Sequence, residues 1–344
     1  MKKKRLFDYN SQILQVSQLA AISVFDFIGK KNEIAADKAA VDSMRQELNK
    51  INFKGTIVIG EGERDQAPML YIGEKVGSCD SKKVDIALDP LEGTRITANN
   101  EKNALTVLAI GDKNSFLYAP DVYMEKIAIG PNLPKTFLDL DKPLEETLQN
   151  ISKYKKKKIS DIVVCVLDRP RHKRIFDIID KCKCKKLLIP DGDIVAAIST
   201  SIKKENIDLY TGIGGAPEGV LAAAALKCLG GQMQCRLIFK NDIQKRRAKK
   251  MGITNLNKKY KINDLIKNDV IFVASGVTDG TLLKGVKKIK NKFIVQSLII
   301  TTKKKKIEFV NNKLDSFHMD KPAPRSAILS NTLTRFISES PISI

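Results

Sequence analysis

Short apolar runs alternate with segments of helical period along almost the whole chain, and this alternation limits the fold more than any other feature. The runs have the length of β-strands, and the segments between them carry apolar residues three and four positions apart, as helices do. The expected strands are 56–59, 84–88, 105–110, 123–129, 162–167, 187–189, 207–210, 234–239, 270–274 and 293–300. The expected helices are 11–28, 40–51, 143–154, 175–179, 194–202 and 220–229. The pattern predicts a protein of the α/β class.

The length allows one large domain or two of medium size, because 344 residues with 43% hydrophobic residues can bury a substantial core. A polar helical segment runs into the lysine cluster Lys155–Lys158, and the alternation of strands and helices then begins again. We therefore predict a boundary near residue 155, between an N-terminal metal-binding half over 1–155 and a C-terminal substrate-binding half over 156–344.

No membrane span is expected, because no stretch of eighteen apolar residues occurs in the sequence. The basic start Met1–Arg5 is followed by polar side chains instead of the apolar core of a secretory signal. The six cysteines show no zinc-binding spacing. Reduced thiols in a cytoplasmic protein are the plain interpretation of these features.

The formal charge of +21 raises nucleic-acid binding as one hypothesis. Basic runs occur at 155–158, 245–250 and 303–306, but few aromatic residues lie beside them and no nucleic-acid-binding signature accompanies them. Lysine, asparagine and isoleucine are all abundant, which indicates a compositional bias of the source. Attraction of a small polyanionic substrate is the simpler consequence of the charge, so we expect no nucleic-acid partner.

The segment Asp89-Pro90-Leu91-Glu92-Gly93-Thr94 follows the apolar run 84–88 and brings two carboxylates and a hydroxyl to the end of a strand. Pro90 restrains the backbone and Gly93 permits a tight turn, so the polar side chains can converge instead of alternating across a sheet. Converging hard oxygen ligands suit Mg²⁺ or Mn²⁺. An ordinary acidic turn explains so short a motif equally well when it is taken alone.

Two further glycine-framed acids follow expected strands. Glu61 lies in Gly60-Glu61-Gly62-Glu63, and Glu218 lies in the glycine-rich segment Gly212–Gly219 before an alanine-rich helix. The second loop can present backbone N–H groups at the positive end of a helix, where a phosphate binds well. Glu218 taken alone is an ordinary first-turn acid, but three such loops in one chain are hard to explain as turns.

Five motifs together resemble the class II fructose-1,6-bisphosphatases of the bacterial type. They are Gly60–Glu63, Asp89–Thr94, Arg169-Pro170-Arg171-His172, Pro190-Asp191-Gly192-Asp193 and Gly212–Gly219. The likeness runs in order from about residue 35 to about residue 280. It implies the sugar-phosphatase fold, a layered α/β/α/β/α sandwich with the active site between two halves. The Asp-Pro-x-acid-Gly-Thr element alone also occurs in inositol monophosphatases and other lithium-sensitive phosphatases, so the combination carries the resemblance.

The resemblance also implies a metal site and a catalytic pair. Its metal ligands are the acids Asp37, Glu61, Asp89, Glu92 and Glu218. They would hold Mn²⁺ or Mg²⁺, with two ions expected, and such ions activate the attacking water and stabilise the leaving oxygen. Thr94 would orient that water and relay a proton towards Asp37, because a threonine hydroxyl has little basicity of its own. Without the resemblance, Asp37 is better explained as a helix N-cap.

The substrate-binding positions implied by the resemblance lie in the same loops. They are Glu92, Gly93, Thr94, Tyr123, Arg169, Arg171, Asp191, Asp193 and Gly215. Arg169 and Arg171 flank a proline after a strand, and a guanidinium pair on a stiffened turn suits the second, non-reacting phosphate. Asp191 and Asp193 would accept hydrogen bonds from sugar hydroxyls. Solvated surface arginines and helix N-caps are the alternatives for these two pairs.

The resemblance therefore implies a metal-dependent phosphatase that releases the 1-phosphate of fructose 1,6-bisphosphate, giving fructose 6-phosphate in gluconeogenesis. A second activity on sedoheptulose 1,7-bisphosphate is one alternative. An inositol-phosphate monoesterase is another, although those enzymes typically take a metal ligand from a Trp-Asp motif and this chain has no tryptophan. A basic nucleic-acid-binding protein is the non-enzyme alternative. We expect a homo-oligomer, a dimer or a tetramer, and we assign no acid–base role to His172, because two-metal hydrolysis supplies its own nucleophile.

Overall fold

The larger of two β-sheets takes its strands from both ends of the chain. The computed structural model describes residues 4–62, 69–79 and 82–315. The strands of this sheet lie in the order β12-β13-β11-β4-β3-β1-β2, and β14 pairs with β13. Their bounds are β1 (Lys54–Ile59), β2 (Lys75–Val76), β3 (Lys83–Glu92), β4 (Leu105–Asp112), β11 (Val270–Gly276), β12 (Lys287–Ile289), β13 (Lys292–Thr301) and β14 (Ile307–Asp315). β1 and β3 pair in parallel, and the other pairs of this sheet are antiparallel.

The second sheet is built from the middle of the chain, in the order β10-β9-β5-β8-β6-β7. Its strands are β5 (Tyr123–Ile129), β6 (Val163–Leu167), β7 (Lys185–Ile189), β8 (Leu209–Gly215), β9 (Gln232–Ile238) and β10 (Tyr260–Lys261). β6 pairs in parallel with both β7 and β8, so the carboxyl ends of these three strands share one edge. Each sheet draws on both sides of residue 155, and the expected boundary there does not coincide with the separation of the two sheets.

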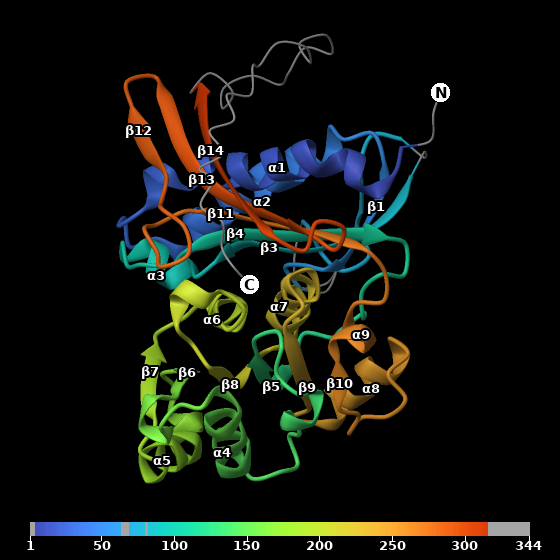
Figure 1. Ribbon diagram of the computed structural model, residues 1–344. Helices are drawn as coiled ribbons and strands as arrows, with labels where there is room; N and C mark the ends of the chain where they lie inside the picture. The colour runs from blue at the N-terminus through green and yellow to red at the C-terminus, as the bar shows by residue number, and fades with distance from the viewer. Residues whose placement is uncertain (1–3, 63–68, 80–81, 316–344) are drawn as a thin grey trace.

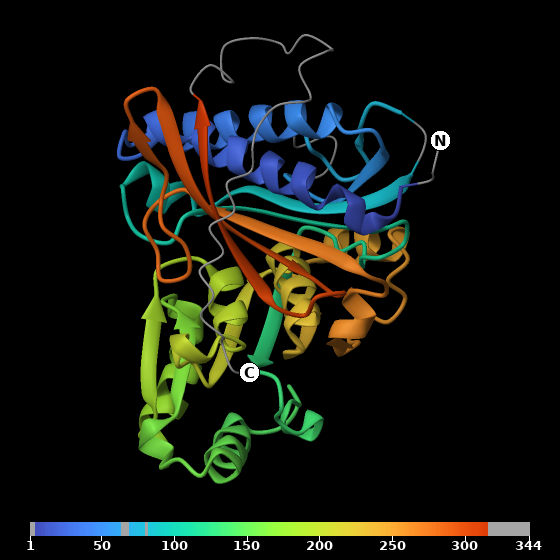
Figure 2. The ribbon, with the colours of Figure 1, turned by 45° about the horizontal axis from the view of Figure 1, so that its top comes forward.

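The helices form three layers around the two sheets (Figures 1 and 2). The longer helices are α1 (Asn10–Ser23), α2 (Glu33–Asn49), α4 (Leu144–Lys155), α5 (Lys173–Lys181), α6 (Asp193–Ser199), α7 (Ala216–Leu229) and α8 (Asp242–Lys250). α1 and α2 pack on the outer face of the first sheet, α6 and α7 lie between the sheets, and α4 and α5 cover the far face of the second. The α/β prediction is confirmed, and the layers follow the expected α/β/α/β/α order.

α7 shows why the sequence produces a helix between two sheets. Its residues Ala222–Ala225 are all buried, because sheets pack against it from both sides. A helix that is apolar all round is stable only when it is enclosed in this way. It begins after Gly215, with Pro217 in its first turn, and ends at Gly230 in the left-handed conformation, φ 75°. The helix therefore has fixed ends, and it lies between the two sheets (Figure 1).

Some expected elements differ from the structure at their ends. The expected helix 11–28 is wrong beyond Ser23, where the short 3₁₀ segment Phe25–Phe27 follows. The Ser23 hydroxyl lies 2.7 Å from the Ala20 carbonyl and 2.9 Å from the Ala39 carbonyl, which ties the helix end to α2. Among the strands, β14 was not expected, because it is half-exposed and rich in asparagine and charged residues. The helix α8 was also missed, because its sequence is mostly charged.

A line of buried polar side chains crosses the centre of the first sheet under α1. The Ser17 hydroxyl lies 2.8 Å from the Ser275 hydroxyl, and that group lies 2.8 Å from the Ser297 hydroxyl. Gln18 donates to Ser297 at 3.1 Å. Buried polar groups of this kind need partners, so the line fixes how α1 sits on β11 and β13.

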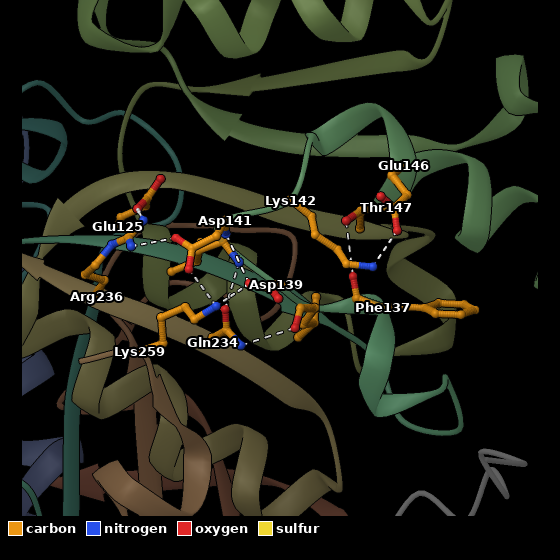
Figure 3. A network of polar contacts seen from close by, with 12 residues as sticks. Glu125, Phe137, Asp139, Asp141, Lys142, Glu146, Thr147, Gln234, Arg236 and Lys259 are labelled. Carbon is orange, nitrogen blue, oxygen red and sulfur yellow. Dashed lines mark hydrogen bonds and ion pairs between the residues drawn. The ribbon is translucent and has the colours of Figure 1, made fainter. Parts of the chain in front are cut away.

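Charged side chains fix the connection that follows β5 (Figure 3). Arg236 on β9 donates to Asp141 at 2.7 Å and to Glu125 at 3.0 Å. Lys259 pairs with the same Asp141 at 2.7 Å and with Asp139 at 2.5 Å. Exposed pairs contribute little stability singly, but this network holds residues 137–141 against the second sheet.

None of the helices in the described part of the chain has the length and apolarity needed to span a bilayer. Within the described ranges, Cys165, Cys182, Cys184, Cys228 and Cys235 form no disulfide bond.

Candidate active site

Three loops that carry expected site residues leave the shared edge of β6, β7 and β8. Arg169 and Arg171 follow β6, Asp191 and Asp193 follow β7, and Gly215 ends β8. Ligands of α/β proteins bind beyond the carboxyl ends of parallel strands, where loops and helix starts converge. The edge faces the first sheet, so these loops lie opposite residues that β3 supplies (Figure 1).

β3 ends in a local irregularity that turns its acids towards this space. Asp89 is opposite Val107 on β4 and Glu92 is opposite Leu105, so the pairing slips between them at Pro90, which has no N–H to donate. The Leu91 amide donates to Asp89 Oδ1 at 3.1 Å. Gly93 then adopts φ 92°, a conformation that glycine tolerates best, and Thr94 begins the short helix α3 (Thr94–Ala98).

The five acids expected to bind metal form one electrostatic cluster. Burial, followed by the charge of Asp89, raises the pKa of Asp37 to about 6 and that of Glu61 to about 8. Burial followed by the charge of Asp193 raises the pKa of Glu218 to about 7. The pKa of Glu92 is raised well above its usual value by burial and by Asp89, with which it shares a hydrogen bond.

The donor set fits a divalent cation, although the side chains are not in ligand positions. Glu218 Oε2 is buried and has no hydrogen-bond partner among the described residues. No three His, Cys, Asp or Glu side chains in the described ranges already converge closely enough to hold a metal ion. Carboxylates that raise one another's pKa are stabilised by a cation, and hard oxygen donors are what Mg²⁺ and Mn²⁺ prefer. We conclude that these residues suit such an ion chemically.

Asp37 and the aspartates after β7 are not helix caps. Asn32 caps α2 by accepting from the Ala35 amide at 3.0 Å, so Asp37 lies inside the helix. Asp193 is the first residue of α6, and no side chain caps that helix. The capping alternatives from the sequence are therefore wrong for these acids, and Asp191 lies one residue before the left-handed Gly192, φ 88°.

Lys126 is a buried cation that sequence reasoning missed. It lies on β5, is 1% exposed, forms an ion pair with Asp193 Oδ2 and donates to the Gly215 carbonyl at 2.8 Å. The Tyr210 hydroxyl also donates to Asp193, at 3.3 Å. The signal for its role was a lysine inside the otherwise apolar end of an expected strand, because a lysine is almost never fully buried unless it is paired.

Glycine is required where the acids lie against the β8 backbone. A Cβ at Gly215 would lie 1.9 Å from Glu218 Oε2, and a Cβ at Gly214 would lie 2.3 Å from Asp193 Oδ2. Real side chains do not tolerate such contacts, so any other residue here would displace the carboxylates.

The arginine loop is mounted on β8 beside Tyr123. Arg171 donates from Nε and Nη2 to the Ile213 carbonyl at 2.9 and 2.7 Å, and its guanidinium lies 5.1 Å from the Tyr123 ring centre. Lys240, which was not expected, lies 4.3 Å from the same ring. Arg169 approaches Asp191 only to 4.0 Å. These cations could hold a phosphate next to the acid cluster.

One known protein family matches this chain over most of its length. A family model described as bacterial fructose-1,6-bisphosphatase, glpX-encoded, matches residues 8–314. A relative from Haemophilus influenzae, named fructose-1,6-bisphosphatase class 2, is 42% identical over 318 residues, which cover 88% of this chain and 94% of the relative. One from Escherichia coli, named fructose-1,6-bisphosphatase 1 class 2, is 41% identical over 91% of this chain and 96% of its own length. A relative from Trichodesmium erythraeum is named D-fructose 1,6-bisphosphatase class 2/sedoheptulose 1,7-bisphosphatase and is 42% identical, over 90% and 95%.

Proposed function

Since the chain belongs to the bacterial class 2 fructose-1,6-bisphosphatase family, we propose that it hydrolyses the 1-phosphate of fructose 1,6-bisphosphate to give fructose 6-phosphate and phosphate. One observation carries the proposal. Glu218 of the acid cluster directly follows β8, and Arg171 is bonded to Ile213 on the same strand, so the cluster and the arginine loop share one edge of the second sheet. The acids suit a reacting phosphate with its metal, and the arginines suit the phosphate that does not react.

The metal ligands we propose are the five acids of the cluster, Asp37, Glu61, Asp89, Glu92 and Glu218. When bound, Mn²⁺ or Mg²⁺ supplies charge that lowers the pKa of water and stabilises the leaving oxygen. The ionised acids cancel the charge of two such ions. Glu218 has an oxygen free for this task, because its Oε2 has no partner in the described part of the chain.

Thr94 is the residue we propose to orient the attacking water. It begins α3 directly after the tight turn at Gly93, beside the acids of β3. Its hydroxyl can accept from the water and donate to a carboxylate, and we propose Asp37 as the group that takes the proton. Thr94 thereby contributes to turnover more than to binding.

The opposite end of the substrate would lie against the loops of the second sheet. We propose that Arg169 and Arg171 bind the phosphate that does not react, with Tyr123 beneath the Arg171 guanidinium. Asp191 and Asp193 accept from sugar hydroxyls. Lys126 and Tyr210 occupy Asp193 Oδ2, which leaves the second oxygen for the sugar. Gly93 and Gly215 bring backbone amides close to the phosphate oxygens.

Sedoheptulose 1,7-bisphosphate is a second candidate substrate, favoured by the name of the Trichodesmium erythraeum relative. Both sugars carry two phosphates, so the arginine loop serves either. We also propose that the reaction serves gluconeogenesis, in the cytoplasm, and that the protein acts as a dimer or tetramer.

The experiment that tests this function compares phosphate release from both bisphosphates and from a small aryl phosphate, with Mn²⁺, with Mg²⁺ and with chelator. The double variant Arg169→Ala, Arg171→Ala should lose roughly a hundredfold in kcat/KM on the bisphosphates, because it loses charged hydrogen bonds. Aryl phosphate hydrolysis should change little. Arg174→Ala, in an exposed position on α5, is the matched control. Equal losses on both substrate types would contradict the assignment of the arginines, and full activity in chelator would contradict the metal mechanism.

A further inference from the structure

His172 lies where the pairing of two parallel strands stops. β6 and β8 pair at Val164 with Leu209 and at Cys165 with Tyr210, while β6 stays paired with β7 as far as Leu167. Beyond Cys165, the fully buried imidazole of His172 bridges β6 and β8 by hydrogen bonds to both. Its Nδ1 lies 2.7 Å from the Leu167 carbonyl, and its Nε2 lies 2.8 Å from the Ile213 amide.

These two contacts determine the protonation of the ring. A carbonyl can only accept, so Nδ1 carries the hydrogen, and a backbone amide can only donate, so Nε2 presents its lone pair. The ring is therefore neutral. The lowered pKa of His172 agrees, since burial is its main cause and the charges of Arg171 and Arg169 also disfavour the cation. On its other side the ring packs edge-on against Phe176 of α5, at 6.3 Å between centres.

The strand β8 leaves room for the ring. A Cβ at Gly212 would lie 3.2 Å from His172 Cε1, tighter than an ordinary contact. A side chain at this position would press on the imidazole, so the glycine and the histidine match one another.

Ile213 connects the histidine to the arginine loop. Its amide donates to His172, and its carbonyl accepts both hydrogen bonds from Arg171. If the amide loses its acceptor, Ile213 keeps its place opposite Glu125 in the β8–β5 ladder but loses its hydrogen bond towards β6. The direction of its carbonyl is then less fixed, and so is the guanidinium that this carbonyl holds above Tyr123.

We propose that His172 is a positioning residue for bisphosphate recognition, holding Ile213 so that Arg171 is presented to the distal phosphate. The inference rests on the proposed function, because it takes Arg171 as a ligand of that phosphate. His172 itself does not touch the substrate, and it acts only in its neutral form with the hydrogen on Nδ1.

Two variants separate the two contacts. In His172→Asn the side-chain amide reaches the place of Nδ1 and can donate to Leu167, but it leaves the Ile213 amide without an acceptor. In His172→Gln the side-chain oxygen reaches the place of Nε2 and can accept from Ile213. We expect His172→Asn to raise KM for fructose 1,6-bisphosphate roughly tenfold, the value of one lost buried hydrogen bond, with a much smaller change in kcat. We expect His172→Gln to restore KM to within about threefold of wild type.

The readouts distinguish the possible failures. An unchanged KM in a folded His172→Asn variant, or an equal loss on aryl phosphate, would overturn the inference and leave the proposed function standing. A wild-type protein that releases no phosphate from either bisphosphate would reject the proposed function instead. Nitrogen NMR of the imidazole gives a test that needs neither an activity assay nor a folded variant. The two ring signals can be assigned because the chain has only two histidines. A cationic ring at pH 7, or one with the hydrogen on Nε2, would overturn the inference.

Discussion

Replacing Glu218 by glutamine should make the metal-free protein more stable and inactive at the same time. The carboxylate has one fully enclosed oxygen without a partner in the described ranges, and burial with the charge of Asp193 raises its pKa from 4.5 to about 7. One pKa unit corresponds to about 1.4 kcal/mol, so ionising this group in the folded chain costs about 3 kcal/mol.

The pH dependence follows from the direction of that shift. Because the folded-state pKa is raised, the stability that the protonated Glu218 retains below about pH 4.5 is lost as the pH rises through about 7. Glutamine has the same shape and cannot ionise. In chelator at pH 8, Glu218→Gln should therefore increase the free energy of unfolding by about 3 kcal/mol, and near pH 5 the two proteins should differ by less than about 1 kcal/mol.

Urea unfolding followed by far-UV circular dichroism measures the effect at both pH values. Glu74→Gln is the matched control, a 5% exposed carboxylate that has partners in Arg45 and the Leu70 amide, and there the substitution should destabilise the protein. Mn²⁺ at a hundred times its dissociation constant should raise the free energy of unfolding of the wild type by about 2.7 kcal/mol, and that of Glu218→Gln by less. The kcat of the variant should fall by at least about a hundredfold. A variant no more stable than wild type at pH 8, or equally stabilised at pH 5, would refute the reasoning.

Three further results are expected. Thr94→Ala should lower kcat and leave KM and calorimetric metal affinity nearly unchanged, whereas a raised KM with normal kcat would make Thr94 a binding residue. Lys126→Met should lower the free energy of unfolding by about 3 to 5 kcal/mol, because it leaves Asp193 buried without its cation; denaturation showing no loss would mean that the pair contributes nothing. Asp208 has a lowered pKa, because two lysines and a backbone amide outweigh its burial. Asp208→Asn should therefore lower the free energy of unfolding above about pH 4, by about 1 to 3 kcal/mol at pH 7. In more acidic solution the two proteins should be equally stable. A difference that persists there would contradict the ion-pair explanation.

The α/β class could be predicted because each strand and helix carries its own periodic pattern. The neighbours of a strand could not, because alternation specifies a face and not a partner. Nothing in the run 105–110 indicates that β4 pairs with β11, which comes from the far end of the sequence. The helix 11–28 failed at Ser23 for a similar reason, since the Ala39 carbonyl that holds its end belongs to another element.

The candidate site also contains residues that the sequence could predict and residues that it could not. The acids at strand ends could be found because glycine and proline mark the turns that present them. Lys126 carried a signal, a lysine in an otherwise apolar strand end, but its partners could not be predicted, and neither could those of His172. Both roles depend on contacts made after folding, with Gly215 in one case and Ile213 in the other. The roles of the acids, the arginines and Thr94 remain predictions until they are measured.

The origin of the first sheet at both ends of the chain has a consequence for synthesis. While the protein is being translated, β4 leaves the ribosome with one edge open, and its partner β11 follows only after the whole second sheet has been made. The hydrogen-bond partner of Ser17, Ser275, is likewise synthesised 258 residues later. An open strand edge is a template for pairing with the wrong chain, and such late contacts slow folding. The nascent chain is therefore most vulnerable to aggregation, and most in need of a chaperone, in the interval between β4 and β11.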